Sequence, residues 1–92
     1  MSTFEVSWEA IEPQAAHCDD THLHVTLANG TEVVAPLWWY PRLQNATPPQ
    51  RAEVEFSAFG LHWPQIDEDL SVLGLIEGRR APGAVPPAEA AE

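Results

Sequence analysis

Residues 60–71 read Gly-Leu-His-Trp-Pro-Gln-Ile-Asp-Glu-Asp-Leu-Ser. This stretch holds a histidine, a tryptophan and three consecutive acids, and it joins the last two elements of the predicted fold. Residues 56–63 are predicted to form a strand. Pro64 is expected to end that strand, because proline cannot donate a hydrogen bond to a ladder.

A closing helix is predicted next, from Leu70 to about Glu77. Asp67 is a candidate N-cap, and Glu68 and Asp69 would lie in the first turn, where the helix dipole favours acids. Gly78 suits the position just after the helix, where a left-handed residue is common. The stretch therefore predicts a strand followed by a capped helix.

A hairpin is predicted upstream, on either side of Ala28-Asn29-Gly30. Apolar and polar residues alternate before and after this turn. A two-residue Asn-Gly loop would place the two apolar sets on opposite faces. A three-residue loop with left-handed Gly30 pairs Val25 with Val33 and puts both sets on one face. The predicted buried face is made of Leu23, Val25, Leu27, Val33, Ala35 and Leu37.

The remaining elements are read from local signals. Apolar and polar residues alternate over residues 4–11, with Phe4, Val6 and Trp8 on one side. This pattern predicts a strand that Pro13 ends. Residues 17–20 are predicted to be a turn, and residues 37–43 a short helical turn.

A helix start is predicted at Thr47. This residue fits the N-cap, Pro48 the first helical position, and Gln50 the closing residue of a capping box. The helix is expected to run from Pro48 to about Glu55.

Together these elements predict a small α+β domain over residues 1–78. It contains an antiparallel β meander of three to four strands, one short helix and one closing C-terminal helix. Residues 79–92 are rich in proline, alanine and glutamate and are predicted to be a disordered tail.

The charge of the chain restricts its partners. Fourteen acids face four basic residues, all of them arginines, for a net charge of −10. Binding to nucleic acid depends on Lys and Arg, so direct nucleic-acid binding by this domain alone is not expected. An acidic surface suits a small basic protein partner, or serves solubility.

Composition also indicates a compartment. One cysteine, Cys18, permits no intrachain disulfide. The N-terminus has neither the basic nor the apolar region of a signal peptide, and no apolar run approaches the roughly 20 residues of a membrane helix. A cytoplasmic protein without membrane association is expected.

Three segments carry a family resemblance. They are Pro-Leu-Trp-Trp-Tyr-Pro-Arg-Leu at 36–43, Ala-Thr-Pro-Pro-Gln-Arg at 46–51, and His-Trp-Pro-Gln-Ile-Asp-Glu-Asp-Leu-Ser at 62–71. Across residues 21–78 the chain resembles short bacterial proteins catalogued as domain of unknown function 2442. The family usually has Asp where this hairpin has Asn29, and both tolerate the left-handed region. The resemblance implies an antitoxin-like component of a two-gene module, encoded beside a second small protein. It establishes no activity.

The candidate functional surface combines polar and aromatic residues from these segments. Its members are Trp39, Tyr40, Arg42, Arg51, His62, Trp63, Asp67, Glu68 and Asp69. In one interpretation they are structural, with Arg42 or Arg51 clamping Asp67 or Asp69. In a second they form a partner-binding surface, with an exposed tryptophan and Tyr40 beside Arg42.

Catalysis is the third interpretation. A small hydrolase or metal-dependent enzyme would use His62 with Asp67, Glu68 and Asp69 for proton transfer or metal binding. The leading hypothesis is a non-enzymatic protein-interaction module with no catalytic residue and no cofactor.

A metal site is an alternative interpretation of His22 and His24, which are two residues apart and share a strand face. His17, Cys18, Asp19 and Asp20 would complete it. Zinc sites usually show two spaced ligand pairs, whereas this chain has a single cysteine. The hairpin register places the histidines on the solvent face, and no metal is predicted.

Overall fold

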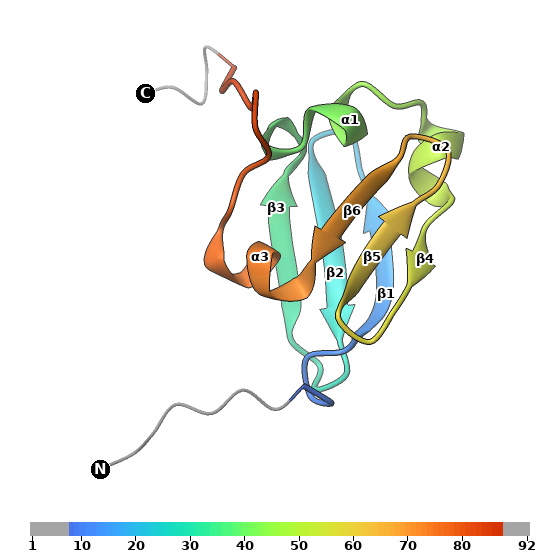
Figure 1. Ribbon diagram of the computed structural model, residues 1–92, viewed down its shortest axis with the longest axis vertical. Coiled ribbons are helices and arrows are strands. Elements are labelled where there is room, and N and C mark those ends of the chain that lie inside the picture. Colours follow the sequence, from blue (N-terminus) through green and yellow to red (C-terminus); the bar gives the residue numbers. More distant parts are fainter. Residues whose placement is uncertain (1–7, 88–92) are drawn as a thin grey trace.

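The computed structural model describes residues 8–87. In this part of the chain, two three-stranded antiparallel sheets form, with strand orders β1-β2-β3 and β4-β5-β6. The second sheet lies in front of the first in Figure 1. The α+β class is confirmed, with six strands in two sheets instead of a single meander of three to four strands.

The elements follow each other with short connections. In chain order they are β1 (Pro13–Cys18), β2 (His22–Leu27), β3 (Glu32–Pro36), the 3-10 helix η1 (Leu37–Trp39), α1 (Pro41–Gln44), α2 (Pro48–Ala52), β4 (Glu55–Phe56), β5 (Gly60–Trp63), β6 (Glu68–Ser71) and α3 (Val72–Glu77). The short helical turn predicted at residues 37–43 is confirmed by η1 and α1.

The hairpin of β2 and β3 has the predicted register. Val25 pairs with Val33, and the Leu27 amide donates to the Thr31 carbonyl at 2.8 Å. Gly30 has φ of 90°, as the three-residue loop requires. The predicted apolar face points into the core, with Val33 half-buried, while Val34 is 47% exposed on the other face.

The first strand was placed wrongly. Residues 8–11 form a turn, and β1 begins at Pro13, the residue expected to end a strand; residues 4–7 lie outside the described part. The amides of Ala28 and Asn29 donate to the carbonyls of Glu12 and Ala10, which holds the turn against the hairpin loop. Proline is tolerated at the first position of a strand. The predicted turn at 17–20 is confined to residues 19–21.

The start of α2 is as predicted. The Thr47 hydroxyl accepts from the Gln50 amide at 3.3 Å, and the Gln50 side chain accepts from the Thr47 amide at 2.9 Å. This capping box satisfies two amides that would otherwise lack partners. The helix ends at Ala52, three residues earlier than predicted, because Glu55 already belongs to β4.

The second sheet differs most from the sequence-based prediction. Residues 56–63 form the end of β4, a turn and β5, instead of one strand. Asp67 is not an N-cap: it has φ of 54° in the turn that joins β5 to β6. Aspartate tolerates this left-handed conformation better than most residues do.

The closing helix α3 begins at Val72, two residues later than predicted. Its N-cap is Ser71, whose hydroxyl accepts from the Gly74 amide at 2.9 Å. Gly78 follows the helix with φ of 77°, as predicted. The amides of Gly78 and Arg79 donate to the carbonyls of Leu75 and Gly74, so a Schellman motif closes the helix.

One hydrophobic core joins both sheets. Leu23 and Val25 from the first sheet, Leu61 and Trp63 from the second, and Val72 from α3 are all almost fully buried. The inner faces of the two sheets therefore pack against each other, with η1, α1 and α3 covering the ends of the core. No helix or strand within residues 8–87 covers the outer face of β4, β5 and β6 (Figure 1).

Part of the predicted tail contacts this domain. The Ala81 amide donates to the Trp39 carbonyl at 2.9 Å, and the Arg80 guanidinium lies 4.8 Å from the centre of the Trp38 ring. The domain boundary at residue 78 stays a prediction, and these contacts place Arg80 and Ala81 against the domain. No helix within residues 8–87 is long and apolar enough to span a bilayer.

Candidate functional site

The three consecutive acids do not form one pocket. Asp67 lies in the turn before β6, while Glu68 and Asp69 are successive residues of β6. Successive side chains of a strand point to opposite faces of the sheet. Glu68 pairs with the buried Trp63 and faces inward, whereas Asp69 pairs with His62 and faces outward. The predicted pocket of His62 with all three acids is therefore divided between two faces.

His62 and Asp69 remain together on the outer face of the second sheet. The His62 Nδ1 atom lies 2.8 Å from Asp69 Oδ1, and the Asp69 side chain is 77% exposed. On the other side, Glu55 pairs with His62 across β4 and β5. A histidine flanked by two carboxylates therefore forms a row across three strands, open to solvent.

Only one of the two arginines contacts the acids. Arg42 donates from Nη1 to the Asp67 carbonyl at 2.5 Å, with the Asp67 carboxylate at 3.9 Å. The predicted clamp is thus made mainly through the backbone of the strained turn. Arg51 forms no ion pair within the described part of the chain, and it donates to the carbonyls of Leu43 and Gln44 at 2.9 and 2.8 Å. It caps the C-terminal end of α1, where cations are favoured.

Two of the aromatic candidates are core residues. Trp63 is fully buried, and its Nε1 donates to the Arg51 carbonyl at 3.0 Å. Tyr40 is 2% exposed, so neither ring is available to a partner. Trp39 is half-buried against the core. The expectation that Tyr40 and Trp63 contribute to a surface is therefore wrong.

Burial changes the acidity of two neighbouring groups. It raises the pKa of Tyr40 to about 12, and the nearby Glu68 carboxylate adds to this effect. Burial likewise raises the pKa of Glu68, although the Asp69 amide donates to its carboxylate at 3.1 Å. Within residues 8–87 the Tyr40 hydroxyl has no hydrogen-bond partner.

Glu68→Gln should stabilise the fold at neutral pH. The pKa of Glu68 is higher in the folded chain than in the unfolded chain, so the ionised carboxylate destabilises the fold at any pH above the pKa of the folded state. This cost vanishes below the pKa of the unfolded chain, about 4.3, where the carboxyl group is protonated in both states. The gain should be about 0.5 kcal/mol or less, because the carboxylate is only partly buried. Urea unfolding at pH 7 and at about pH 3.5 measures it. A gain that is equal at both pH values would contradict this explanation.

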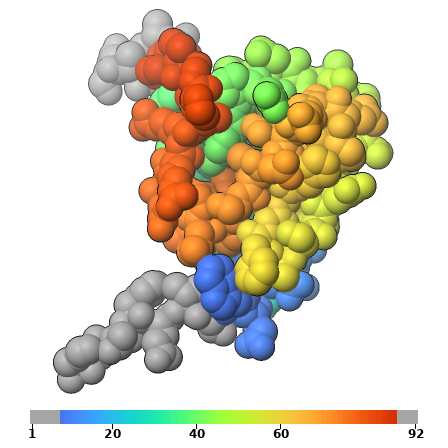
Figure 2. Space-filling model, in the orientation of Figure 1, coloured from blue at the N-terminus to red at the C-terminus, as the bar shows by residue number. Residues whose placement is uncertain are grey.

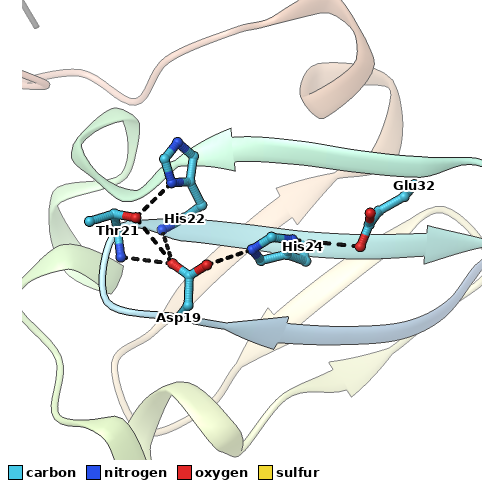
Figure 3. Close-up of polar contacts among 5 residues, drawn as sticks. All are labelled: Asp19, Thr21, His22, His24 and Glu32. Carbon is cyan, nitrogen blue, oxygen red and sulfur yellow. Dashed lines mark hydrogen bonds and ion pairs between the residues drawn. The ribbon is translucent and has the colours of Figure 1, made fainter.

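A second polar cluster lies at the β1–β2 turn and on the first sheet (Figure 3). Asp19 Oδ1 accepts from the amides of Thr21 and His22 at 2.8 and 2.6 Å, and its Oδ2 lies 2.8 Å from His24 Nε2. The other His24 nitrogen lies 3.5 Å from Glu32. His17 and His24 stack, with ring centres 4.6 Å apart. His22 and His24 share a face, as predicted, and His24 contacts two carboxylates.

This cluster does not combine into a cation site. No group of three His, Cys, Asp or Glu side chains in the described part of the chain is placed to hold a metal ion. The His22 ring turns to the Thr21 hydroxyl at 2.7 Å, away from Asp19. Partial burial raises the pKa of the Cys18 thiol, which disfavours the thiolate that metals require.

Asp19 sets the titration of His24. Hydrogen bonding to Asp19, with smaller contributions from Glu32, raises the pKa of His24 above 6.5. Asp19→Asn should lower this pKa towards its ordinary value, and Glu32→Gln should lower it less. An NMR titration of the His24 ring protons measures this pKa in both variants. It should run from about pH 5 to about pH 9, which spans the ordinary histidine pKa of about 6.5. An unchanged His24 pKa in Asp19→Asn would contradict the contact.

Asp19 and His24 also make the stability of the fold depend on pH, and their two contributions change in opposite directions as the pH rises. Protonated His24 stabilises the fold below about pH 6.5, and this contribution is lost as the pH rises through its raised pKa. The amides of Thr21 and His22, together with His24, lower the pKa of Asp19. Ionised Asp19 therefore stabilises the fold above about pH 3.9, and this contribution is lost as the pH falls.

The exposed aromatic residues have no counterpart among the sequence-based predictions. Trp8, Phe56 and Phe59 are 46%, 46% and 57% exposed. The sequence predicts Trp8 on one side of an N-terminal strand and a single strand over residues 56–63, and neither prediction distinguishes these rings. The Trp8 and Phe59 rings meet edge to face, with centres 5.2 Å apart. Exposed aromatic side chains that contact each other are typical of a binding surface.

Comparisons with known proteins agree with the resemblance. A family model described as "Protein of unknown function (DUF2442)" matches residues 13–81. A crystal structure of a protein of unknown function from Rhodospirillum rubrum is similar at 31% identity and a TM-score of 0.68, covering 79% of this chain and 93% of that one.

A solution NMR structure of an uncharacterized protein from Chromobacterium violaceum is similar at 28% identity, also with a TM-score of 0.68. The match covers 78% of this chain and 70% of that one. The comparison with curated proteins found no match.

Proposed function

Because the chain belongs to the family of proteins of unknown function DUF2442, whose description names no activity, we propose a function from the surface of this chain. It is a small non-enzymatic module that binds a protein partner. One observation carries this proposal: Trp8, Phe56 and Phe59 are about half exposed around the second sheet. A small domain needs its aromatic side chains for its core, so leaving three accessible favours an interface.

The arrangement of the acids also favours binding over catalysis. His62 has one close carboxylate, Asp69, on an open sheet face, and the other two acids of the motif point elsewhere. A general base works best where burial and neighbouring groups tune its pKa and hold the substrate in place. His62, Asp69 and the neighbouring Glu55 form a row that is open to solvent, without the enclosure that holds a substrate in place.

Charge indicates the kind of partner. The net charge of −10 disfavours nucleic acid and favours a small basic protein. We assign that role to the product of the neighbouring gene, so that this chain is the acidic, antitoxin-like half of a two-gene pair in the cytoplasm. The family resemblance and the acidity support this assignment.

Co-expression with the neighbouring gene product tests the proposal. The two proteins should elute together in size-exclusion chromatography at about 50 mM salt. The complex should weaken at least tenfold in 0.5 M salt, because exposed charge pairs are screened. Separate elution at both salt concentrations would reject the partner assignment.

Growth measurements test the antitoxin-like part separately. Expression of the neighbour alone should arrest growth of the host, and co-expression of this chain should restore it. A harmless neighbour that still forms a complex would leave the binding module in place and reject the antitoxin role.

A further inference from the structure

Two adjoining hollows open on the outer side of the second sheet. One, of about 570 Å³, is bordered by β4, β5 and β6, and the other, of about 520 Å³, lies between Trp8 and Leu73. Phe59 and Ser71 line both hollows, so the two hollows are adjacent, and we refer to them together as the groove. Figure 2 shows this face, with the first described residues in blue against the β4–β5 turn in yellow.

One end of this groove is apolar. Trp8, Phe59 and Leu73 line it, and the two aromatic rings support each other at 5.2 Å. The single charge at this end belongs to Arg79, which is paired with Glu77 at 2.6 Å. This end therefore offers aromatic surface with its one positive charge already neutralised.

The other end is acidic. Glu55, His62 and Asp69 form the cross-strand row described above, and all three line the hollow. Gly60, which has no side chain, also lines this hollow. A carboxylate row about two strand spacings wide, roughly 10 Å, thus adjoins an aromatic end within one groove.

We propose that this groove binds a peptide segment of a protein partner in which an aromatic or large aliphatic side chain lies next to Lys or Arg. The inference rests on the proposed function and names the surface and the segment that it recognises. Charge complementarity selects the occupant: Glu55 and Asp69 accept hydrogen bonds from a cationic side chain. Trp8 and Phe59 receive the apolar anchor, as aromatic residues do at the centres of interfaces. A second copy of this chain is disfavoured, because it would bring net charges of −10 together.

A random twelve-residue peptide library displayed on phage, panned against the full chain, tests this groove. Recovered peptides should combine Lys or Arg with an aromatic or large aliphatic residue within about three positions. Binding of a recovered peptide should fall at least tenfold in Phe59→Asp and in Asp69→Lys. Asp20→Lys is the matched control, because Asp20 is an exposed acid in the β1–β2 turn, outside both hollows. It should leave binding within about twofold, and thermal melts establish that each variant is folded.

Several results would overturn the inference. The first is panning that yields no enriched peptide, and the second is enriched peptides that lack Lys and Arg. The third is a recovered peptide that binds Phe59→Asp and Asp69→Lys as tightly as the unsubstituted chain. A dimer of the chain that Phe59→Asp dissociates would assign the groove to a second copy and also overturn it. If the neighbour's complex persists in both variants, the proposed function stands and this groove is rejected. If selected peptides bind as expected while the neighbour does not, the groove stands and the partner assignment fails.

Discussion

Replacing Gly60 with alanine should destabilise the domain by about 2 to 3 kcal/mol, the upper part of the range for forcing extra atoms into a packed site. A Cβ atom at this position would overlap the backbone carbonyl oxygen of Leu70. That carbonyl belongs to β6, which is paired with β5, so it cannot move without disturbing the ladder. The loss is a large part of the roughly 5 to 14 kcal/mol expected for a chain of this length.

Urea unfolding of Gly60→Ala measures this effect. Val85→Ala is the control, because the Val85 side chain is 73% exposed and lies outside the core. The control should change the free energy of unfolding by no more than about 0.5 kcal/mol, as is usual for surface positions. Equal midpoints for Gly60→Ala and the unsubstituted chain would show that the β5–β6 approach is looser than described.

Replacing Trp63 with alanine should have the largest effect, about 3 to 5 kcal/mol. The ring is fully buried between the two sheets, and its removal leaves a cavity that the thin core cannot fill. It also removes the hydrogen bond from Nε1 to the Arg51 carbonyl, which ties β5 to α2. If the stability of the domain lies at the lower end of the expected range, about 5 kcal/mol, this loss would remove most of it.

The matched control for this variant is Trp38→Ala. Trp38 is half-buried, and its ring stacks with the exposed Arg80, so its loss should amount to about 1 kcal/mol. Circular dichroism during thermal unfolding compares the two variants. Similar losses for both would mean that Trp63 is not the centre of the core.

The elements that the sequence predicts correctly are those determined by local chemistry. The register of the β2–β3 hairpin follows from the side-chain period of two and from Gly30, since any other register splits the apolar face. The start of α2 follows from Thr47 and Gln50, which satisfy each other's amides. Such signals act within five or six residues, so the sequence alone reveals them.

The second sheet could not be predicted in the same way. Asp67 in a left-handed turn and Asp67 as an N-cap look the same in sequence, because aspartate suits both. The outcome depends on pairing between β5 and β6, and on the Arg42 contact from a distant segment. Ser71, the actual cap, carries the same kind of signal four residues later.

The candidate site was affected by the same error. On a helix, Glu68 and Asp69 would share the first turn, whereas on β6 they point to opposite faces. The binding residues proposed here include Phe59, which a single strand over 56–63 would have treated as an ordinary strand residue. Its exposure arises from the β4–β5 turn, which no local signal identified.

The most direct test of binding by the outer face of the second sheet is an NMR titration. The ¹⁵N-labelled full chain is titrated with the unlabelled neighbouring gene product, and the backbone amide signals are followed. The proposed function and groove predict that the largest changes cluster at Glu55, Phe59, His62, Asp69 and Ser71. Amides of the Asp19–His24 cluster on the first sheet should be unaffected. Spectra that do not change at equimolar partner, or changes confined to the first sheet, would contradict the proposed role of this face.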